Sequence, residues 1–184
     1  MRGLQRLLPK LSIVNVVATA ELKQFVNLEK LVHVSGFLYD TAIYQCAYLK
    51  DRNTRAKVSI FATGKMISVG AKSFQAAKHD LNYAARRLTE LELISHTRIK
   101  TKLQNIVATG ELGHSVDIES FAKLPNVIYE PEQFPCAIYY AKELEGASIL
   151  IFANGKVVFA GLRRQELLEV AESVLKDLTE LISR

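Results

Sequence analysis

The stretch Gln104-Asn-Ile-Val-Ala-Thr-Gly-Glu-Leu112 decides the fold, because the chain contains a close copy of it ninety residues earlier, at Val14-Asn-Val-Val-Ala-Thr-Ala-Glu-Leu22. Six of the eight positions from Asn15 to Leu22 are identical in the two copies. Such a repeat has to be recognised before any element is assigned, since a missed duplication gives the wrong fold.

The duplication extends along both halves of the chain. Cys46 matches Cys136 at the same offset, and Ile60–Lys65 matches Ile151–Lys156 one residue further on. Two copies of about ninety residues are too long and too few for a solenoid of stacked repeats. We therefore predict a pseudo-twofold protein with a first repeat at 10–95, a basic linker at 96–102 and a second repeat at 103–184.

Composition narrows the class of protein. The chain has 184 residues, of which 49% are hydrophobic, enough to bury a core as one domain or two fused halves. No apolar run reaches the roughly 18 residues of a membrane span, and the apolar part of residues 1–10 is too short for a signal peptide. We expect a soluble intracellular protein. Cys46 and Cys136 lack nearby histidines at ligand spacing, so we interpret them as small residues of the sheet and expect no metal.

The net charge of +5 is unevenly distributed. Residues 1–95 carry 14 Lys and Arg against 7 Asp and Glu, whereas residues 96–184 carry 10 against 12. A basic balance indicates a polyanionic partner, and the asymmetry indicates that the two halves do different jobs. The alternative is that the charge serves solubility alone.

Each half reads as a strand, a short helix, four strands and a long helix. In the first half these are expected at 11–20, 27–33, 37–43, 46–50, 57–62, 66–70 and 74–92. In the second half a strand is expected at 103–110, helices near 117–124 and 164–182, and four strands between the helices, ending at Gly161. This order predicts an α+β fold with an antiparallel sheet. Helices on one face leave an apolar open face, which we interpret as a binding surface.

Four segments of the second half carry a resemblance to a known family: Gln104-Asn-Ile-Val-Ala108, Tyr129-Glu-Pro-Glu-Gln-Phe-Pro135, Leu150-Ile-Phe152 and Gly155-Lys-Val157. With them, and a decayed second set ninety residues earlier, the chain resembles the TATA-box binding protein family over about residues 10–182. Its short N-terminal part looks more like that of an archaeal member than a nuclear one. The resemblance implies a pseudo-twofold saddle, with ten antiparallel strands forming a curved, concave DNA-binding sheet and four helices on the convex face.

The resemblance also implies roles for individual positions. In the minor groove A·T pairs present only acceptors, so an apolar floor tolerates them and rejects the guanine amine. Asn15 and Asn105 would be the central donors, and apolar wedges would pry apart base steps at each end. The floor would include Val17, Ile67, Val107, Leu150 and Val158; the wedges would be Phe61, Phe134 and Phe152; and Lys65, Lys72, Lys156 and Arg163 would meet phosphates.

Each role has a structural alternative. A phenylalanine in a strand is more often core than wedge, and a Gly-Lys hairpin is usually a turn with a solvated charge. An asparagine in a valine-rich strand is harder to explain structurally, because a buried amide needs partners. Two such residues, Asn15 and Asn105, at equivalent positions favour a functional role.

The first repeat departs from the family pattern. The fourth wedge becomes Tyr44, whose hydroxyl costs desolvation in a base stack. Ser59 stands where the second repeat has Leu150. The usual threonine after the hairpin is replaced by Val69 and by Ala160, and an expected arginine is Tyr140, while Lys50 keeps the cation of the first repeat. Our hypothesis is a weaker or altered A·T preference, above all at the first-repeat end.

The acidic loop of the second repeat keeps the whole family motif, and Glu130 and Glu132 match the residues that dock transcription factor B in the family. The alternative is an ordinary exposed acidic loop. We predict a general transcription initiation factor that binds and bends TATA-type promoter DNA and recruits factor B and, with it, RNA polymerase. We expect no cofactor and no enzymatic activity, because the chain has no paired carboxylates, nucleophile–base set or phosphate loop.

Two other functions stay open. One is a divergent paralogue that regulates transcription or works at non-TATA promoters, and the other is a protein-interaction module that kept the saddle but lost productive DNA binding. Whether the DNA-free protein forms a homodimer through its apolar face is also left open. The expected location is the archaeal cytoplasm beside the nucleoid, or the nucleus if the source is eukaryotic.

Overall fold

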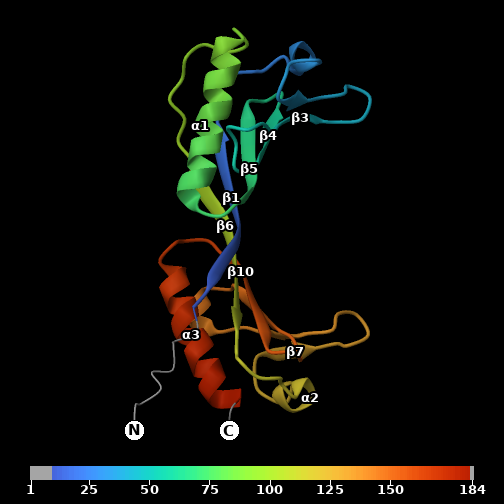
Figure 1. The fold of residues 1–184 in the computed structure, drawn as a ribbon, viewed down its shortest axis with the longest axis vertical. Helices are drawn as coiled ribbons and strands as arrows, with labels where there is room; N and C mark the ends of the chain where they lie inside the picture. The colour runs from blue at the N-terminus through green and yellow to red at the C-terminus, as the bar shows by residue number, and fades with distance from the viewer. Residues whose placement is uncertain (1–9, 183–184) are drawn as a thin grey trace. The chain divides into compact units, whose positions relative to one another are not determined.

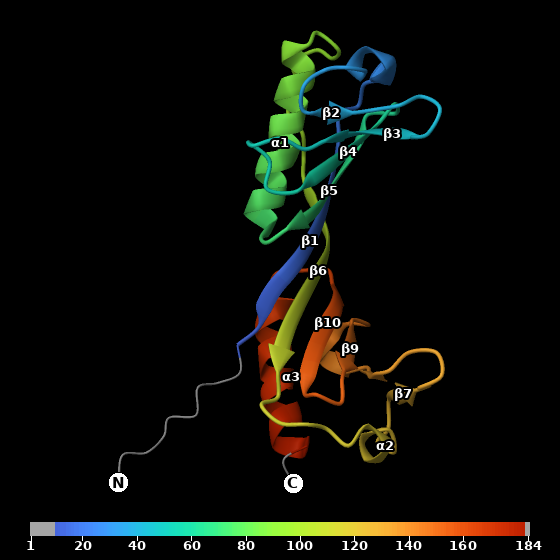
Figure 2. The same cartoon turned by 45° about the vertical axis from the view of Figure 1, so that its right-hand side comes forward.

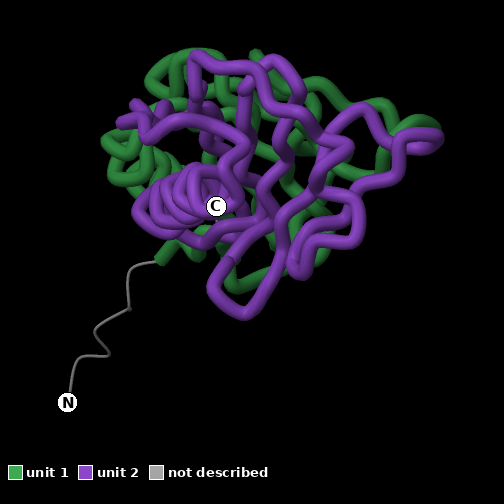
Figure 3. The backbone as a smooth tube through the Cα atoms, turned by 90° about the horizontal axis from the view of Figure 1, so that it is seen from above, with its two compact units in different colours: residues 1–13, 106–184 green, residues 14–105 purple. Residues whose placement is uncertain are grey.

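The computed structural model describes residues 10–182 and divides into two compact units (Figure 3). Unit 2 is the continuous segment 14–105, whereas the described part of unit 1 combines residues 10–13 with residues 106–182. Strands β1 (Ser12–Glu21) and β6 (Lys102–Glu111) each have residues in both units.

Unit 2 is an antiparallel sheet covered on one face by a helix. After β1 come the 3-10 helix η1 (Leu28–Leu31), strands β2 (Phe37–Leu38), β3 (Cys46–Leu49), β4 (Lys57–Phe61) and β5 (Lys65–Ala71), and helix α1 (Phe74–Glu90). The strand order is β2-β3-β4-β5-β1. The first residues of β6 also belong to this unit, where the Gln104 amide donates to the Thr19 hydroxyl at 2.8 Å.

The core of unit 2 lies between the sheet and α1, which runs along one side of the strands (Figure 1). Side chains alternate along each strand, so every second residue faces the helix. Ser73 caps the helix by accepting a hydrogen bond from the Ala76 N–H. The buried residues on the two sides of this contact include Val16, Ala18, Val58, Ile60 and Met66 from the strands and Leu81, Ala84 and Leu88 from α1.

Unit 1 repeats this plan. After β6 come α2 (Ile118–Phe121), β7 (Val127–Tyr129), β8 (Ala137–Tyr139), the 3-10 helix η2 (Lys142–Leu144), β9 (Ser148–Ile151), β10 (Lys156–Leu162) and α3 (Leu167–Ile182). The strand order is β6-β10-β9-β8-β7, again with antiparallel neighbours. Helix α3 lies beside the sheet, and the loop between β7 and β8 projects on the other side (Figure 2).

The α+β class and the ten antiparallel strands are confirmed, but the helices differ from the four predicted. The described residues contain three α-helices and two 3-10 helices. The helix expected at 27–33 is only the 3-10 helix η1, because the Asn27 side chain accepts from the Glu29 N–H and the Val32 N–H bonds the carbonyl only three residues back. The sequence pattern gives no indication of helix η2.

The strand predicted at 37–43 is wrong in length, since β2 ends at Leu38. The Asp40 carboxylate accepts the N–H of Ala42 at 2.8 Å, and the Asp40 carbonyl accepts the N–H of Tyr44 at 2.8 Å. Aspartate forms such turns with the backbone two residues ahead. The chain therefore turns at the point where the sequence suggests an extended strand.

Two equivalent glycines close the β4–β5 and β9–β10 hairpins. Gly64 and Gly155 both have φ of +83°, and a Cβ atom at either would collide with a backbone carbonyl oxygen, that of Gln24 or of His114. The Gly64 carbonyl accepts the N–H of Leu22 at 3.0 Å, just after β1. The Gly155 carbonyl accepts the N–H of Leu112 at 2.9 Å, just after β6. Only glycine fits both the conformation and the close approach.

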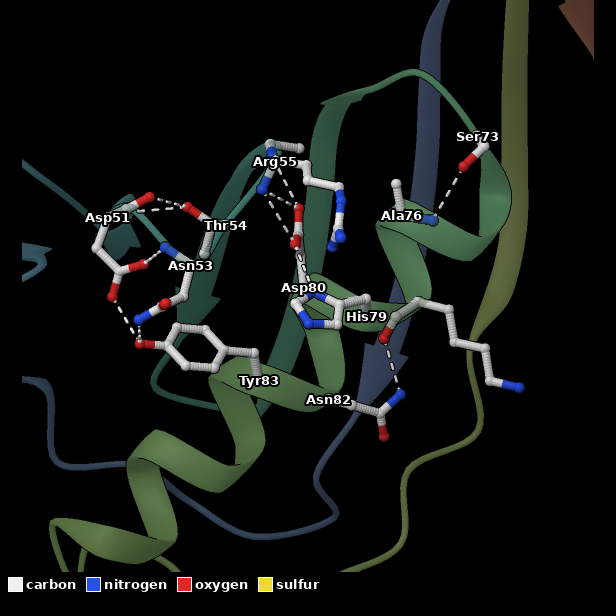
Figure 4. Close-up of polar contacts among 12 residues, drawn as sticks. Asp51, Asn53, Thr54, Arg55, Ser73, Ala76, His79, Asp80, Asn82 and Tyr83 are labelled. Atoms are coloured by element: carbon white, nitrogen blue, oxygen red, sulfur yellow. Dashed lines mark hydrogen bonds and ion pairs between the residues drawn. The ribbon is translucent and has the colours of Figure 1, made fainter.

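A buried carboxylate fastens α1 to the loop between β3 and β4 (Figure 4). The Asp80 side chain is fully buried and accepts the N–H of Ala56 at 2.7 Å and of Arg55 at 3.1 Å. One turn along the helix, the Tyr83 hydroxyl donates to the Asp51 carboxylate at 2.7 Å. Leu88-Thr-Glu-Leu91 recurs as Leu178-Thr-Glu-Leu181, so the equivalent of Asp80 in the second repeat is Val170, and this anchor belongs to unit 2 alone.

Candidate nucleic-acid interface

The face of unit 1 opposite α3 carries a cross-strand row of aliphatic side chains. Strand register aligns Ile128 with Ile138, Ile138 with Leu150, Leu150 with Val158, and Val158 with Thr109. These side chains are half-buried or exposed, whereas their neighbours along each strand are mostly buried. The row is an apolar floor of the kind predicted for Leu150 and Val158.

Two phenylalanines stand beside this floor. The rings of Phe134, in the β7–β8 loop, and Phe152, at the end of β9, pack edge to face with centroids 6.2 Å apart. Phe134 is 45% exposed and Phe152 is half-buried. Edge-to-face packing holds each ring at a defined angle. The structure therefore brings the two predicted wedges of the second repeat together.

The open face of unit 2 has the equivalent row with different chemistry. Register aligns Leu38 with Tyr48, Tyr48 with Ser59, Ser59 with Ile67, and Ile67 with Thr19. Leu38, Ile67 and Thr19 match the character of Ile128, Val158 and Thr109 in unit 1. The two middle positions do not, because Tyr48 and Ser59 replace Ile138 and Leu150.

Tyr44 occupies the position of the fourth wedge, equivalent to Phe134. Its ring packs against Tyr48, whereas the Phe134 ring packs against Phe152. The Tyr44 and Tyr48 rings meet edge to face with centroids 5.4 Å apart, and the Lys57 Nζ atom lies 4.4 Å from the centroid of the Tyr48 ring. A hydrogen bond with the Cys46 side chain raises the pKa of Tyr48 above its ordinary value. The Tyr48 hydroxyl thus keeps its proton at neutral pH. Phe61, the predicted wedge of this repeat, is half-buried at the end of β4.

A β-bulge orients Asn15. Gly70 has φ of +102°, the β1–β5 register shifts between Val16 and Val17, and the Gly70 N–H donates to the Asn15 Oδ1 atom at 2.8 Å. The amide oxygen is occupied by this bond, so the Nδ2 hydrogens are the donors that Asn15 offers to a partner. Asn105 is half-buried at the equivalent position of β6.

The small apolar site residues lie on β1 and β6, which carry the two asparagines, or on the paired strands β5 and β10. Val17 pairs with Val69 across β1 and β5, and Val69 is 39% exposed. Val107 is half-buried on β6, and Ala160 is half-buried opposite Ser148. All four are accessible positions that lack a hydrogen-bonding side chain.

The predicted cations fall into two groups. Lys65 and Lys156 open the equivalent strands β5 and β10 and are exposed, as is Arg163 just after β10. The Lys72 and Lys50 ammonium groups instead donate to backbone carbonyls, Lys72 to Val14 at 2.7 Å and Lys50 to Arg55 at 3.3 Å. Each ammonium group would have to give up its carbonyl before it could bind a phosphate.

Sequence reasoning missed two further cations. Lys100 and Lys102 join Lys65, Phe61 and Ile67 in lining a pocket of about 520 Å³ on unit 2. The sequence places them only in the basic linker. The two lysines alternate with Ile99 and Thr101, and every second residue of an extended segment faces the same side. This alternation could have indicated that Lys100 and Lys102 lie on one face.

Glu130 and Glu132 lie in the loop between β7 and β8, and both are exposed. The Glu130 carbonyl accepts the N–H groups of Gln133 and Phe134, each at 3.0 Å, which folds the loop into a turn. The same turn therefore presents the acidic side chains and sets the position of Phe134.

Other kinds of site find no support in the part of the chain that is described. Within residues 10–182 no helix is both long and apolar enough to cross a membrane, and no group of His, Cys, Asp and Glu could hold a metal ion. Cys46 and Cys136 are buried free thiols, and burial raises the pKa of Cys136.

Comparison with known proteins gives a consistent result. The family model described as "Transcription factor TFIID (or TATA-binding protein, TBP)" matches residues 10–91 and 100–181. The chain is 36% identical to the TATA-box-binding protein of Cenarchaeum symbiosum over 172 residues, 92% of each chain, and 32% identical to that of Thermococcus celer over 174 residues, 94% of this chain and 90% of the other. The solved structure of Methanococcus jannaschii TBP matches with a TM-score of 0.80 and 27% identity, covering 95% of this chain and all of that one.

Proposed function

This chain belongs to the TATA-binding protein family of general transcription initiation factors, and we propose that it binds the minor groove of TATA-type promoter DNA, bends it and recruits transcription factor B. Members of the family bind promoter DNA and are not enzymes. The observation that carries the proposal is the aliphatic row Ile128–Ile138–Leu150–Val158 beside the Phe134–Phe152 pair. The repeats at 10–95 and 103–184 would each read one half of the site.

The aliphatic row explains a preference for A·T pairs in physical terms. A guanine amine pressed against Leu150 and Val158 would lose its water and find no acceptor, which costs free energy. A·T pairs present no such donor in the minor groove. Asn15, whose Nδ2 hydrogens remain to be donated, suits the acceptors that every pair offers there.

The aromatic pair provides the means of bending. Apolar side chains that enter a base step from the minor groove partly unstack it and kink the duplex toward the major groove. Phe134 and Phe152 form such a wedge, already packed before DNA arrives. Lys65, Lys156 and Arg163 would neutralise phosphates on either side and make the affinity dependent on salt.

The remaining parts of the proposal concern partners and location. Factor B would dock on the acidic β7–β8 loop, and the RNA polymerase pre-initiation complex would assemble on that platform. Without DNA, the aliphatic row is the surface through which a homodimer would form. The relatives are archaeal, which supports a place beside the nucleoid; in a eukaryote it would be the nucleus.

Binding to a TATA duplex and to a G·C-substituted duplex, measured across a salt series, tests the DNA-binding step. We expect the TATA duplex to bind at least about tenfold more tightly, because each unfavourable base pair typically costs about 1–3 kcal/mol. Affinity for both duplexes should fall as salt rises. Equal affinity for the two duplexes at every salt concentration would contradict minor-groove recognition by an apolar floor.

A divergent paralogue is the second candidate, and the polar middle of the unit 2 row, Tyr48 and Ser59, favours it. The same salt series separates the two functions when it is repeated with factor B. A paralogue should bind both duplexes weakly and gain affinity only with factor B. A protein-interaction module should bind neither duplex under any of these conditions.

Reversing the charge of the acidic loop should separate factor B recruitment from DNA binding. For Glu130→Lys combined with Glu132→Lys we expect binding to the TATA duplex within about threefold of wild type, and formation of the ternary complex with factor B weakened about tenfold or more. A mobility-shift titration with factor B measures both. The matched control is Asp177→Lys with Glu180→Lys on α3, which makes the same charge change behind the sheet. Equal losses in the two double variants would point to net charge alone.

A further inference from the structure

The two repeats differ most where their open faces should be alike. The pairs Tyr48–Ser59 in unit 2 and Ile138–Leu150 in unit 1 occupy equivalent places, each between β3 and β4 or between β8 and β9. The residues that flank them along the row keep the same character in both units. Along the row, the difference is therefore confined to Tyr48 and Ser59. Together with the neighbouring Lys57 they define what we name the polar patch.

Ser59 changes this patch in two ways at once. Its half-buried side chain points to the open face between Tyr48 and Ile67, where Leu150 stands in the other repeat. A serine occupies less volume than a leucine, so it leaves room above the strand. Its hydroxyl is also a hydrogen-bond acceptor, which no leucine offers. The guanine amine in the minor groove needs both properties, space and an acceptor.

Tyr48 and Lys57 extend the polar patch. Tyr44 on one side and the Lys57 ammonium on the other hold the Tyr48 ring, whose hydroxyl can both donate and accept. Lys57 lies on the open face because it pairs with the exposed Val69, and its equivalent in the second repeat is Ser148. Its ammonium can donate to the O2 and N3 acceptors that G·C pairs share with A·T pairs.

A pocket next to Tyr48 gives these side chains room to adjust. It measures about 480 Å³ and is lined by Tyr44, Tyr48, Lys57, Leu38 and other residues of the same edge. Tyr44, Tyr48 and Lys57 therefore border open space at this edge of the sheet.

We propose that the polar patch lets the first repeat accept a G·C pair, while the aliphatic row of the second repeat rejects it. Recognition is then asymmetric. A promoter site with G·C at one end would bind in one orientation, with the first repeat over that end. This inference rests on the proposed minor-groove binding and adds which residues set its sequence preference.

A set of three duplexes tests the asymmetry whichever way round the protein binds. One duplex has only A·T pairs, a second has a G·C pair near one end of the site, and a third has a G·C pair near both ends. The wild-type protein can turn its first repeat toward a single G·C pair, so we expect the first two duplexes to bind within about threefold of each other. The third should bind about tenfold or more weakly, because one G·C pair must then meet Leu150.

Reciprocal substitutions identify the residue responsible. Ser59→Leu should lower affinity for the single-G·C duplex about tenfold relative to the affinity of the same variant for the A·T duplex. Leu150→Ser should raise affinity for the double-G·C duplex, because neither repeat then presents a leucine at this position. Inosine in place of guanine removes only the amine, so it should rescue Ser59→Leu on the single-G·C duplex. Thermal melts of both variants check that each remains folded.

The outcomes separate this inference from the function on which it rests. If the wild type binds the A·T duplex but discriminates against one G·C pair as strongly as against two, the polar patch does not accept guanine. An unchanged preference in Ser59→Leu, or no rescue by inosine, would also overturn the assignment. Failure of the wild type to bind even the A·T duplex would instead refute the proposed function.

Discussion

Replacing Phe152 by alanine is expected to weaken binding to a TATA duplex by about a hundredfold and to remove most of the bend. Phe152 packs edge to face with Phe134, so its loss removes one wedge and also the support that holds the other at its angle. A hundredfold loss corresponds to about 2.7 kcal/mol, within the few kcal/mol that unstacking of a base step involves. Fluorescence anisotropy gives the affinity, and energy transfer between dyes at the duplex ends gives the bend.

Two controls keep this prediction specific. Leu181→Ala removes a half-exposed apolar side chain from α3, away from the open face, and should leave both readouts unchanged. Phe61→Ala tests the first repeat. We expect it to reduce the bend less, because no partner ring equivalent to Phe134 is available there once Tyr44 packs on Tyr48. If Phe152→Ala kept its affinity and its bend, the aromatic pair would be a structural contact only.

Asp80→Ala should lower the free energy of unfolding by about 3 kcal/mol. The substitution leaves the buried N–H of Ala56 and the part-buried N–H of Arg55 without their acceptor, and it also removes the contact with the His79 ring at 3.1 Å. Unpaired buried donors cost about 1–3 kcal/mol each, and partial access of water limits the sum. Urea unfolding followed by circular dichroism measures the change.

The chain offers graded controls for Asp80. Asp80→Asn keeps one acceptor oxygen and should lose about half as much stability as Asp80→Ala. Asp177→Ala removes an exposed carboxylate on α3 and should change stability by less than about 0.5 kcal/mol. A loss in Asp80→Ala no larger than in Asp177→Ala would mean that water replaces the buried carboxylate.

The repeat made much of the fold predictable, since strands that alternate buried and accessible side chains recur at a fixed offset in both halves. What escaped prediction depends on contacts between side chains and backbone. The hydrogen bond from the Ala42 N–H to the Asp40 carboxylate turns the chain, so β2 has only two residues. Neither β-propensity nor periodicity predicts this hydrogen bond. The hydrogen bond from Lys72 to the Val14 carbonyl forms only when the neighbouring strand is in place.

In the candidate site, too, the residues were predictable but their contacts were not. The choice of Phe134, Phe152 and Asn15 as site residues came from the family resemblance, whose motifs they match. The partner of Asn15 could not be predicted, because it is a backbone N–H released by the bulge at Gly70. The packing of Tyr44 onto Tyr48 also depends on which aromatic rings share one edge of the sheet, and the sequence pattern does not contain that pairing.

The chain connectivity of the two units bears on the order in which they can fold during synthesis. Unit 2 is built entirely from residues 14–105, so the ribosome supplies all of its parts before it reaches the bulk of unit 1. Unit 1 needs both ends of the chain: the Leu11 N–H donates to the Glu172 carboxylate at 3.4 Å across 161 positions. Closing so long a loop is slow and entropically costly from an unfolded chain, but a unit 2 that has already folded shortens the effective loop. The repeat that departs most from the family pattern is thus the one that can fold first.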